Sequence, residues 1–178
     1  MEIIKLVFGI LLSLGTIVLF FLSFKLFYKY LIQEKRCTSR VTGVVKKYTL
    51  FRRGGERSGS FLPIVYYVVN NKEYKVVGPE YKAYVEKTVI SPRSKNKAEF
   101  TEDNQVLKSN ISINSAGGSH INPIRQNYPI NSEIDVYYDP NNPKLAYVLR
   151  YCNKKWMFWL MFFSGIFILI MDIAILLM

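Results

Sequence analysis

The sequence has few of the residue types that enzymes commonly use for catalysis and metal binding. It has one histidine, His120, and two cysteines, Cys37 and Cys152, among 178 residues. This set leaves no zinc site with the usual four-ligand spacing, and the chain has neither a glycine-rich phosphate loop nor an HExxH motif. His120 stands in a Gly/Ser loop, where the sequence shows no orienting carboxylate or oxyanion site for a hydrolase. We therefore expect a non-enzymatic protein without a cofactor or a metal site.

Charge is nearly absent from two long apolar segments at the ends of the chain. Leu6–Phe24 contains no charged residue, and Trp156–Met178 contains only Asp172. At about 1.5 Å per helical residue, each segment covers the roughly 30 Å of hydrocarbon in a bilayer. The first segment is longer than the apolar core of a signal peptide and has no cleavage site after it. The sequence thus predicts two retained transmembrane helices, at residues 3–32 and 156–178, in a two-pass protein of the cell membrane.

The net charge is strongly positive, and most of it lies between these two segments. The chain has 24 Lys and Arg against 13 Asp and Glu, a net charge of +11. Cations and aromatic rings cluster at the inner ends of both segments, a pattern typical of a headgroup belt. Each cation near an anionic leaflet contributes about 1 kcal/mol of attraction, so we expect a bilayer with anionic headgroups as partner, rather than nucleic acid. The predicted membrane-contacting residues are Lys25, Lys29, Lys35, Arg36, Arg40, Lys154, Lys155, Trp156 and Trp159.

The orientation follows from the same cations, since translocation of Lys and Arg next to a membrane span is disfavoured. This rule places the central domain in the cytoplasm. The two cysteines argue weakly for the opposite side. Cys37 directly follows the first helix and Cys152 directly precedes the second, and a disulfide between them would require an extracytoplasmic domain. A bridge and two unrelated thiols are both compatible with the sequence.

The central residues 37–150 carry the pattern of a small β domain. β-branched and aromatic residues alternate with polar ones, and turn residues separate the runs. Phe61–Val69 is apolar on both of its faces, as expected for a strand in the middle of a small barrel. Asn70-Asn71 predicts a two-residue hairpin turn, and Asp139-Pro140 begins a second turn. The candidate strands are Val41–Val45, Phe61–Val69, Glu73–Val77, Ile134–Tyr138 and Leu145–Leu149.

Two polar stretches interrupt this pattern. Arg52–Ser60 has the composition of a basic hairpin tip. The longer stretch, about residues 78–131, is too long for a structureless loop in a compact domain. We expect it to be either an elaboration with its own secondary structure, with strands at Ala98–Phe100 and Val106–Ile113, or a recognition surface. The candidate partner-binding residues are Arg52, Arg53, Arg57 and His120.

Three segments together resemble a known family. They are Val41-Thr42-Gly43-Val44-Val45, the Pro63-x-Val65-x-Tyr67-x-Val69 strand followed by Glu73-Tyr74, and Ile134-Asp135-Val136-Tyr137-Tyr138-Asp139-Pro140-Asn141-Asn142-Pro143. They are similar to a family of functionally uncharacterised bacterial membrane proteins with a small β domain ending in YYDPxNP, flanked by membrane helices. This chain departs from the family at Asn131-Ser132, where Gly-Asp is common, and in its long insert. The resemblance implies an architecture but no activity, cofactor or catalytic residue.

The apolar segments also contain polar and small residues suited to helix pairing. Small residues allow two membrane helices to approach closely. Asp172 is the only acid in either segment, and a hairpin brings it to the same side as Lys5. Because a charge within hydrocarbon is costly, we hypothesise that Lys5 and Asp172 pair; alternatively each reaches the headgroups alone. The small residues expected at the helix contact are Gly9, Ser13, Thr16 and Gly165.

These observations predict a membrane α + β protein. A two-helix transmembrane hairpin would carry one small, mostly antiparallel β barrel or sandwich with a long insert. The favoured function is a membrane-anchored binding or accessory protein, such as an immunity-type protein, that recognises a protein or peptide near the membrane. The alternative is a subunit of a membrane transport, secretion or envelope-remodelling complex that acts through its helices.

Overall fold

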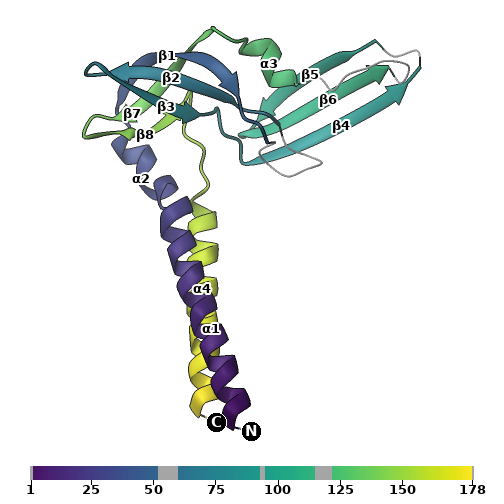
Figure 1. The fold of residues 1–178 in the computed structure, drawn as a ribbon. Helices are drawn as coiled ribbons and strands as arrows, with labels where there is room; N and C mark the ends of the chain where they lie inside the picture. Colours follow the sequence, from purple (N-terminus) through teal and green to yellow (C-terminus); the bar gives the residue numbers. More distant parts are fainter. Residues whose placement is uncertain (1, 52–59, 93–94, 115–121, 178) are drawn as a thin grey trace. The chain divides into compact units, whose positions relative to one another are not determined.

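The computed structural model describes residues 2–51, 60–92, 95–114 and 122–177. The chain divides into two compact units (Figure 1): residues 1–34 with 153–178 form a helix pair, and residues 35–152 form a β domain. Within the described residues, two helical stretches are long and apolar enough to cross a membrane, Leu6–Arg36 and Lys155–Ile175. The two units are described separately below.

The first helical stretch is longer than the predicted 3–32 and is not uniformly α-helical. It consists of α1 (Glu2–Leu22), a π-helical turn (Ser23–Phe27) and α2 (Lys29–Arg36). At the π-helical turn the Tyr28 amide donates to the Ser23 carbonyl, 3.1 Å away and five residues back. Such a wide turn is a local irregularity that apolar periodicity does not reveal. The last helix, α4, spans Lys155–Leu177.

The helices α1 and α4 run side by side, with the two chain ends together (Figure 1). Their buried positions repeat every seven residues: Gly9, Thr16 and Ser23 on the first helical stretch, and Phe158, Gly165 and Asp172 on α4. We call these six residues the seam. A seven-residue repeat keeps one stripe of each helix facing the other in a left-handed pair.

Aromatic rings fill the seam around its small residues. The Phe20 ring lies against Gly165, where an added Cβ would be 3.0 Å from the ring. Phe24 packs edge-on against Phe158, with ring centroids 5.4 Å apart. The Ser23 hydroxyl donates to the Phe158 carbonyl at 3.4 Å. Small residues on one helix thus provide the space that large rings on the other occupy.

The β domain contains the predicted antiparallel sheet, which has five strands in the order β3-β2-β1-β7-β8. Its edge strands β3 and β8 lie against each other, so the sheet is nearly closed into a small barrel. We call it the five-stranded sheet. Its strands are β1 (Ser39–Tyr48), β2 (Pro63–Val69), β3 (Lys72–Val77), β7 (Glu133–Asp139) and β8 (Asn142–Val148).

Alternating residues of the five-stranded sheet form its core. The buried side chains are Val45, Val65, Tyr67, Val69, Ile134, Val136, Ala146 and Val148. Gly43 has to be a glycine, because a Cβ there would lie 2.5 Å from Val65 Cγ1. β2 is an inner strand of the nearly closed sheet, paired with β1 and β3, as its apolar sequence predicts. Its outer face is not fully covered, since Val68 is 55% exposed.

Both predicted turns are confirmed. Asn70 and Asn71 have φ angles of 51° and 59°, the left-handed pair that a two-residue hairpin between β2 and β3 requires. The turn between β7 and β8 is held by Asp139, whose Oδ1 accepts a 2.9 Å hydrogen bond from the Asn141 amide. Asp139 thereby performs the turn-initiating role that its position before Pro140 predicts.

The insert folds as a second sheet with its own small core. The three-stranded sheet has the order β4-β6-β5, formed by β4 (Ala83–Ser91), β5 (Lys97–Asp103) and β6 (Val106–Asn114). The short helix α3 (Pro123–Asn127) follows. The predicted strands in the insert are confirmed as β5 and β6, whereas β4 was not predicted. The core beneath the three-stranded sheet consists of Leu62, Tyr81, Leu107 and Ile124.

The close contact at Gly165 yields a first prediction. Gly165→Leu should lower the free energy of unfolding by about 1–3 kcal/mol, because the new side chain collides with Phe20. Gly15→Leu is the matched control, since nothing lies within 4 Å of a Cβ at Gly15, and both changes raise helix propensity equally. Titration of the micelle-embedded chain with SDS, followed by tryptophan fluorescence, measures both. Equal effects of the two substitutions would contradict the packing.

Candidate functional site

Several cations predicted to contact the membrane also pair with carboxylates within the protein. Arg40 Nη2 lies 2.7 Å from Asp135 Oδ2, and Lys155 pairs with Glu34. Arg36 Nε lies 2.9 Å from Asp139 Oδ2. The basic cluster is thus partly neutralised within the protein, which the charge count along the sequence did not include.

The remaining belt residues lie on or next to aromatic rings. Lys25 Nζ is 4.9 Å from the centre of the Phe21 ring, and Lys29 Nζ is 4.6 Å from that of Tyr30. Lys154 approaches the same Tyr30 ring at 5.8 Å. Cation–π contacts of this kind are compatible with an amphipathic belt. Six of the nine belt residues are exposed, namely Lys25, Lys35, Arg36, Arg40, Trp156 and Trp159.

The seam contains a buried polar group. Ser13 Oγ donates a 2.6 Å hydrogen bond to Asp172 Oδ2, and Asp172 is only 3% exposed. One turn away from Ser13, Thr16 is also buried, and the described residues offer no hydrogen-bond partner to Thr16 Oγ1 or Asp172 Oδ1. A carboxyl group therefore bridges α1 and α4 inside a mostly apolar contact.

The proposed Lys5–Asp172 pair lies outside what the structure describes, because the Lys5 side chain is not among the described ones. Lys5 is eight residues before Ser13 in α1, which corresponds to about 12 Å along a helix axis. Ser13 therefore meets Asp172 roughly two turns deeper than Lys5. The pairing stays a hypothesis, and Ser13 is a partner of Asp172 that sequence position alone did not suggest.

A second buried carboxyl group lies in the β domain, at the end of β7. Asp139 is 1% exposed; its Oδ1 holds the β7–β8 turn, and its Oδ2 faces Arg36 as an ion pair without hydrogen-bond alignment. Next to Arg36, Cys37 Sγ donates to the Leu145 carbonyl at 3.3 Å. Burial, reinforced by the nearby Asp139 charge, raises the pKa of the Cys37 thiol to about 11. Cys37 and Cys152 are both buried thiols, which corresponds to the second of the two alternatives considered for them.

Buried tyrosines act as packing residues with a hydrogen-bonding end. Tyr67 donates to the Pro143 carbonyl and Tyr48 to the Tyr128 carbonyl. Burial raises the pKa of both phenols to about 12, so they remain neutral donors at physiological pH. Burial likewise raises the pKa of Tyr81 above its usual range. These contacts account for the tyrosines through strand packing.

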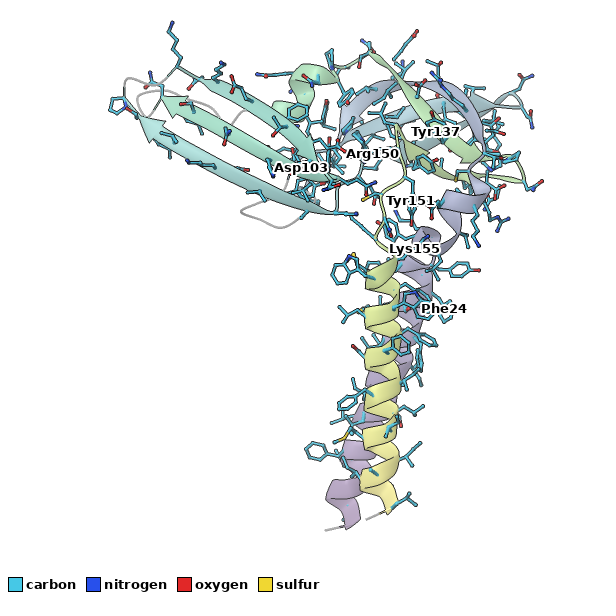
Figure 2. The ribbon with its side chains drawn as sticks, turned by 180° about the vertical axis from the view of Figure 1, so that it is seen from behind. Phe24, Asp103, Tyr137, Arg150, Tyr151 and Lys155 are labelled. Atoms are coloured by element: carbon cyan, nitrogen blue, oxygen red, sulfur yellow. The ribbon has the colours of Figure 1, made fainter. Side chains whose placement is uncertain are left out.

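Arg150 joins the two sheets of the β domain. Its side chain lies between them (Figure 2), where it pairs with Glu102 of β5 and donates to the Glu80 carbonyl at 2.7 Å. The guanidinium also lies over the Tyr81 ring, 4.9 Å from its centre. Within residues 35–152, Arg150 therefore orients the three-stranded sheet relative to the five-stranded sheet.

The three-stranded sheet presents one open face. The register places Val85, Lys87 and Val89 of β4 in rows with β6 and β5: Lys87 is beside Asn110, and Val89 beside Ser112. On β5, Glu99 and Lys97 complete these two rows. An open depression of about 320 Å³ lies on this face, lined by Lys87, Val89, Lys97, Glu99, Asn110, Ile111 and Ser112.

The exposure of β4 distinguishes it from the other strands. Val85 is 54% exposed, Val89 50% and Ile90 65%. Such β-branched residues are usually found on pleated surfaces that are at least half covered. The candidate partner residues named from the sequence, Arg52, Arg53, Arg57 and His120, lie outside the described residues. β4 is thus a candidate surface that the sequence did not indicate.

Comparison with protein-family models, with curated proteins and with solved structures finds no match. The resemblance based on the YYDPxNP segment therefore stays a prediction. Within the described residues, no group of three or more His, Cys, Asp or Glu side chains could hold a metal ion.

The Ser13–Asp172 contact yields a second prediction. In a double-mutant cycle with Ser13→Ala and Asp172→Ala, the two effects on unfolding free energy should be non-additive by about 0.6–1.7 kcal/mol, as for other hydrogen bonds between membrane helices. SDS titration of the four chains gives the coupling energy. Additive effects would show that the hydrogen bond does not form. The same cycle with Lys5→Met in place of Ser13→Ala tests the Lys5–Asp172 hypothesis.

Proposed function

We propose that this chain is a non-enzymatic, membrane-anchored binding protein. The helix pair spans the cell membrane twice, and the β domain, on the cytoplasmic side, recognises a protein or peptide partner close to the bilayer. An immunity-type protein, which binds a toxin or peptide at the membrane, fits this description.

The exposed faces of the helix pair support the membrane part of this proposal. Among the described side chains of α1 and α4, only seam residues are buried, while large apolar side chains cover the remaining circumference. A soluble protein rarely exposes so much apolar surface, whereas lipid tails would solvate it. Examples are Leu14, Ile17 and Phe21 on α1 and Leu160, Phe163 and Phe167 on α4, each more than half exposed.

The exposed face of the three-stranded sheet supports the proposed binding function. One of its faces is covered, as buried Leu107, Ser109 and Ile111 show, and the other presents β-branched and basic side chains around an open depression. The insert therefore supplies an additional ordered surface, because the five-stranded sheet contains none of its strands. Ordered, exposed and partly apolar surfaces are typical of sites that bind another molecule.

A second candidate function acts through the helices. The carboxyl group of Asp172 is buried between α1 and α4 with one oxygen that no described residue satisfies. Polar groups inside membrane helices commonly mark functional contacts. A subunit of a transport, secretion or envelope-remodelling complex would use this group, and Asp172→Asn would then abolish function while the chain remained folded and inserted.

The orientation yields a third prediction. With both native cysteines replaced by serine, a cysteine at the exposed position Thr101 should not react with a membrane-impermeant maleimide in intact cells, and should react after permeabilisation. The reason is the cationic belt, in which Lys25, Lys29, Lys35 and Lys154 favour the cytoplasmic side. Rapid labelling of intact cells would place the β domain outside.

The binding function yields a fourth prediction. Replacing residues 83–114 by a short Gly/Ser linker should abolish crosslinking of the chain to its partner in membranes, because it removes the three-stranded sheet. Membrane insertion should be retained, since the helix pair is untouched. The matched control is Lys72→Glu on the five-stranded sheet, which should keep the partner. Retained crosslinking by the shortened chain, or its loss in the control, would contradict the proposal.

A further inference from the structure

The segment that directly follows β1 carries the most exposed large apolar side chains in the described part of the β domain. Leu50 is 87% exposed and Phe51 81%, whereas the other large apolar side chains described in this domain are at most 65% exposed. Single apolar side chains on a surface are common, but adjacent exposed ones are typical of contact sites. Residues 52–59, which follow, lie outside the described residues and are not part of this surface.

Hydrogen bonds hold this apolar pair in place. The Thr49 amide donates to the Leu62 carbonyl at 2.9 Å, and the Leu62 amide donates to the Thr49 hydroxyl at 3.1 Å. The same hydroxyl donates to the Phe51 carbonyl at 3.0 Å. Because Leu62 belongs to a buried core, Thr49 ties the backbone on both sides of Leu50 to a fixed support. The two apolar side chains therefore project from an ordered part of the chain.

A β-bulge places two lysines beside this pair. The register of β1 against β2 shifts between Val45 and Lys47, so that Lys46 is the extra residue and both lysines are exposed. In a regular strand one of two neighbours would point to the opposite face. Neither lysine forms an ion pair with a described residue. The surface that we call the β1-end patch consists of Lys46, Lys47, Leu50 and Phe51.

The chemistry of the β1-end patch matches a bilayer with anionic headgroups. Such a surface offers phosphates to cations and, about 5–10 Å deeper, hydrocarbon to apolar side chains. Leu50 and Phe51 project outward, and a lipid layer accepts projecting side chains without a matching cavity. Both ends of the β domain continue into the helical unit, which keeps the domain next to any bilayer that these helices span.

We propose that the β1-end patch docks the β domain onto an anionic lipid surface. Its two apolar side chains enter the boundary between headgroups and acyl chains, and its two lysines bind lipid phosphates. This contact goes beyond the proposed recognition of a partner by the three-stranded sheet, and it rests only on the proposed membrane anchor. It holds the β domain to the bilayer at a second point, in addition to the helices.

The proposal is tested with the full-length chain in lipid nanodiscs. After replacement of both native cysteines by serine, a fluorescent probe is attached at Leu50→Cys or, as a control, at Thr101→Cys, an exposed position of β5. Nitroxide groups on the acyl chains should quench the probe at position 50 in nanodiscs of phosphatidylcholine with about one third phosphatidylserine, and much less in pure phosphatidylcholine. The probe at position 101 should remain unquenched in both.

Two double variants with equal charge change locate the contact. Lys46→Glu with Lys47→Glu should lower the ratio of docked to undocked β domain roughly tenfold, because two attractions become repulsions. Lys72→Glu with Lys75→Glu, at exposed positions of β3, should not change this ratio. Phe51→Asp tests the apolar part of the contact and should also abolish the quenching, since a charge is excluded from hydrocarbon.

The other occupants of this surface give different results. Equal quenching of the two probes, equal quenching with and without phosphatidylserine, or equal effects of the two double variants would overturn the proposal. So would an unquenched probe at position 50, and capture of a protein by a photocrosslinker at Phe51 in cell membranes would then assign the patch to a protein partner. A chain that fails to insert into nanodiscs would contradict the membrane anchor itself, and the docking with it.

Discussion

The β domain depends on how the carboxyl group of Asp139 is satisfied. A buried carboxylate without partners would cost several kcal/mol, and Asp139 is almost completely buried. One oxygen accepts from the Asn141 amide and fixes the β7–β8 turn, while the other faces Arg36. The turn between β7 and β8 is thereby tied to Arg36, which lies just before β1. The Asp139 carboxyl group thus holds the beginning of the β domain against its last hairpin.

The helix pair is held together more by side-chain packing than by charge. Two spacings of seven residues on each side place small residues opposite aromatic rings, and the single carboxyl group in the contact is met by a hydroxyl. Without a hydrophobic driving force inside a bilayer, close packing and a few hydrogen bonds are the available sources of helix association. Gly165 allows the close packing and Asp172 supplies a hydrogen bond, and the two residues are seven positions apart on α4.

Much of the architecture could be predicted from local patterns. The apolar segments indicated both helices, and alternation with Asn-Asn and Asp-Pro turns indicated all the strands of the five-stranded sheet. What could not be predicted depends on contacts distant in sequence. β4 is no more polar than β5 or β6, but it pairs with β6 and not with the next strand in the sequence, so no local hairpin pattern indicates it. The ion pairs of Arg36, Arg40 and Arg150 are equally non-local, so the sequence alone does not show them.

The candidate binding surface illustrates the same limit. Composition indicated Arg52, Arg53, Arg57 and His120 as partner-binding residues, because basic and Gly/Ser-rich stretches can be recognised directly in a sequence. The exposed face of β4 has no such composition, because it forms only when β4 pairs with β6.

The parallel pairing of β4 has a consequence for the order of folding. β5 and β6 form a local hairpin, closed by Asn104 and Gln105 with left-handed φ angles of 48° and 65°. β4 precedes this hairpin and pairs with its second strand, so the chain must close a loop of two strands before β4 gains any sheet hydrogen bond. Loop closure of that length slows pairing. We therefore expect β4 to dock last and to detach first, so that β4 is the least stable strand of the three-stranded sheet.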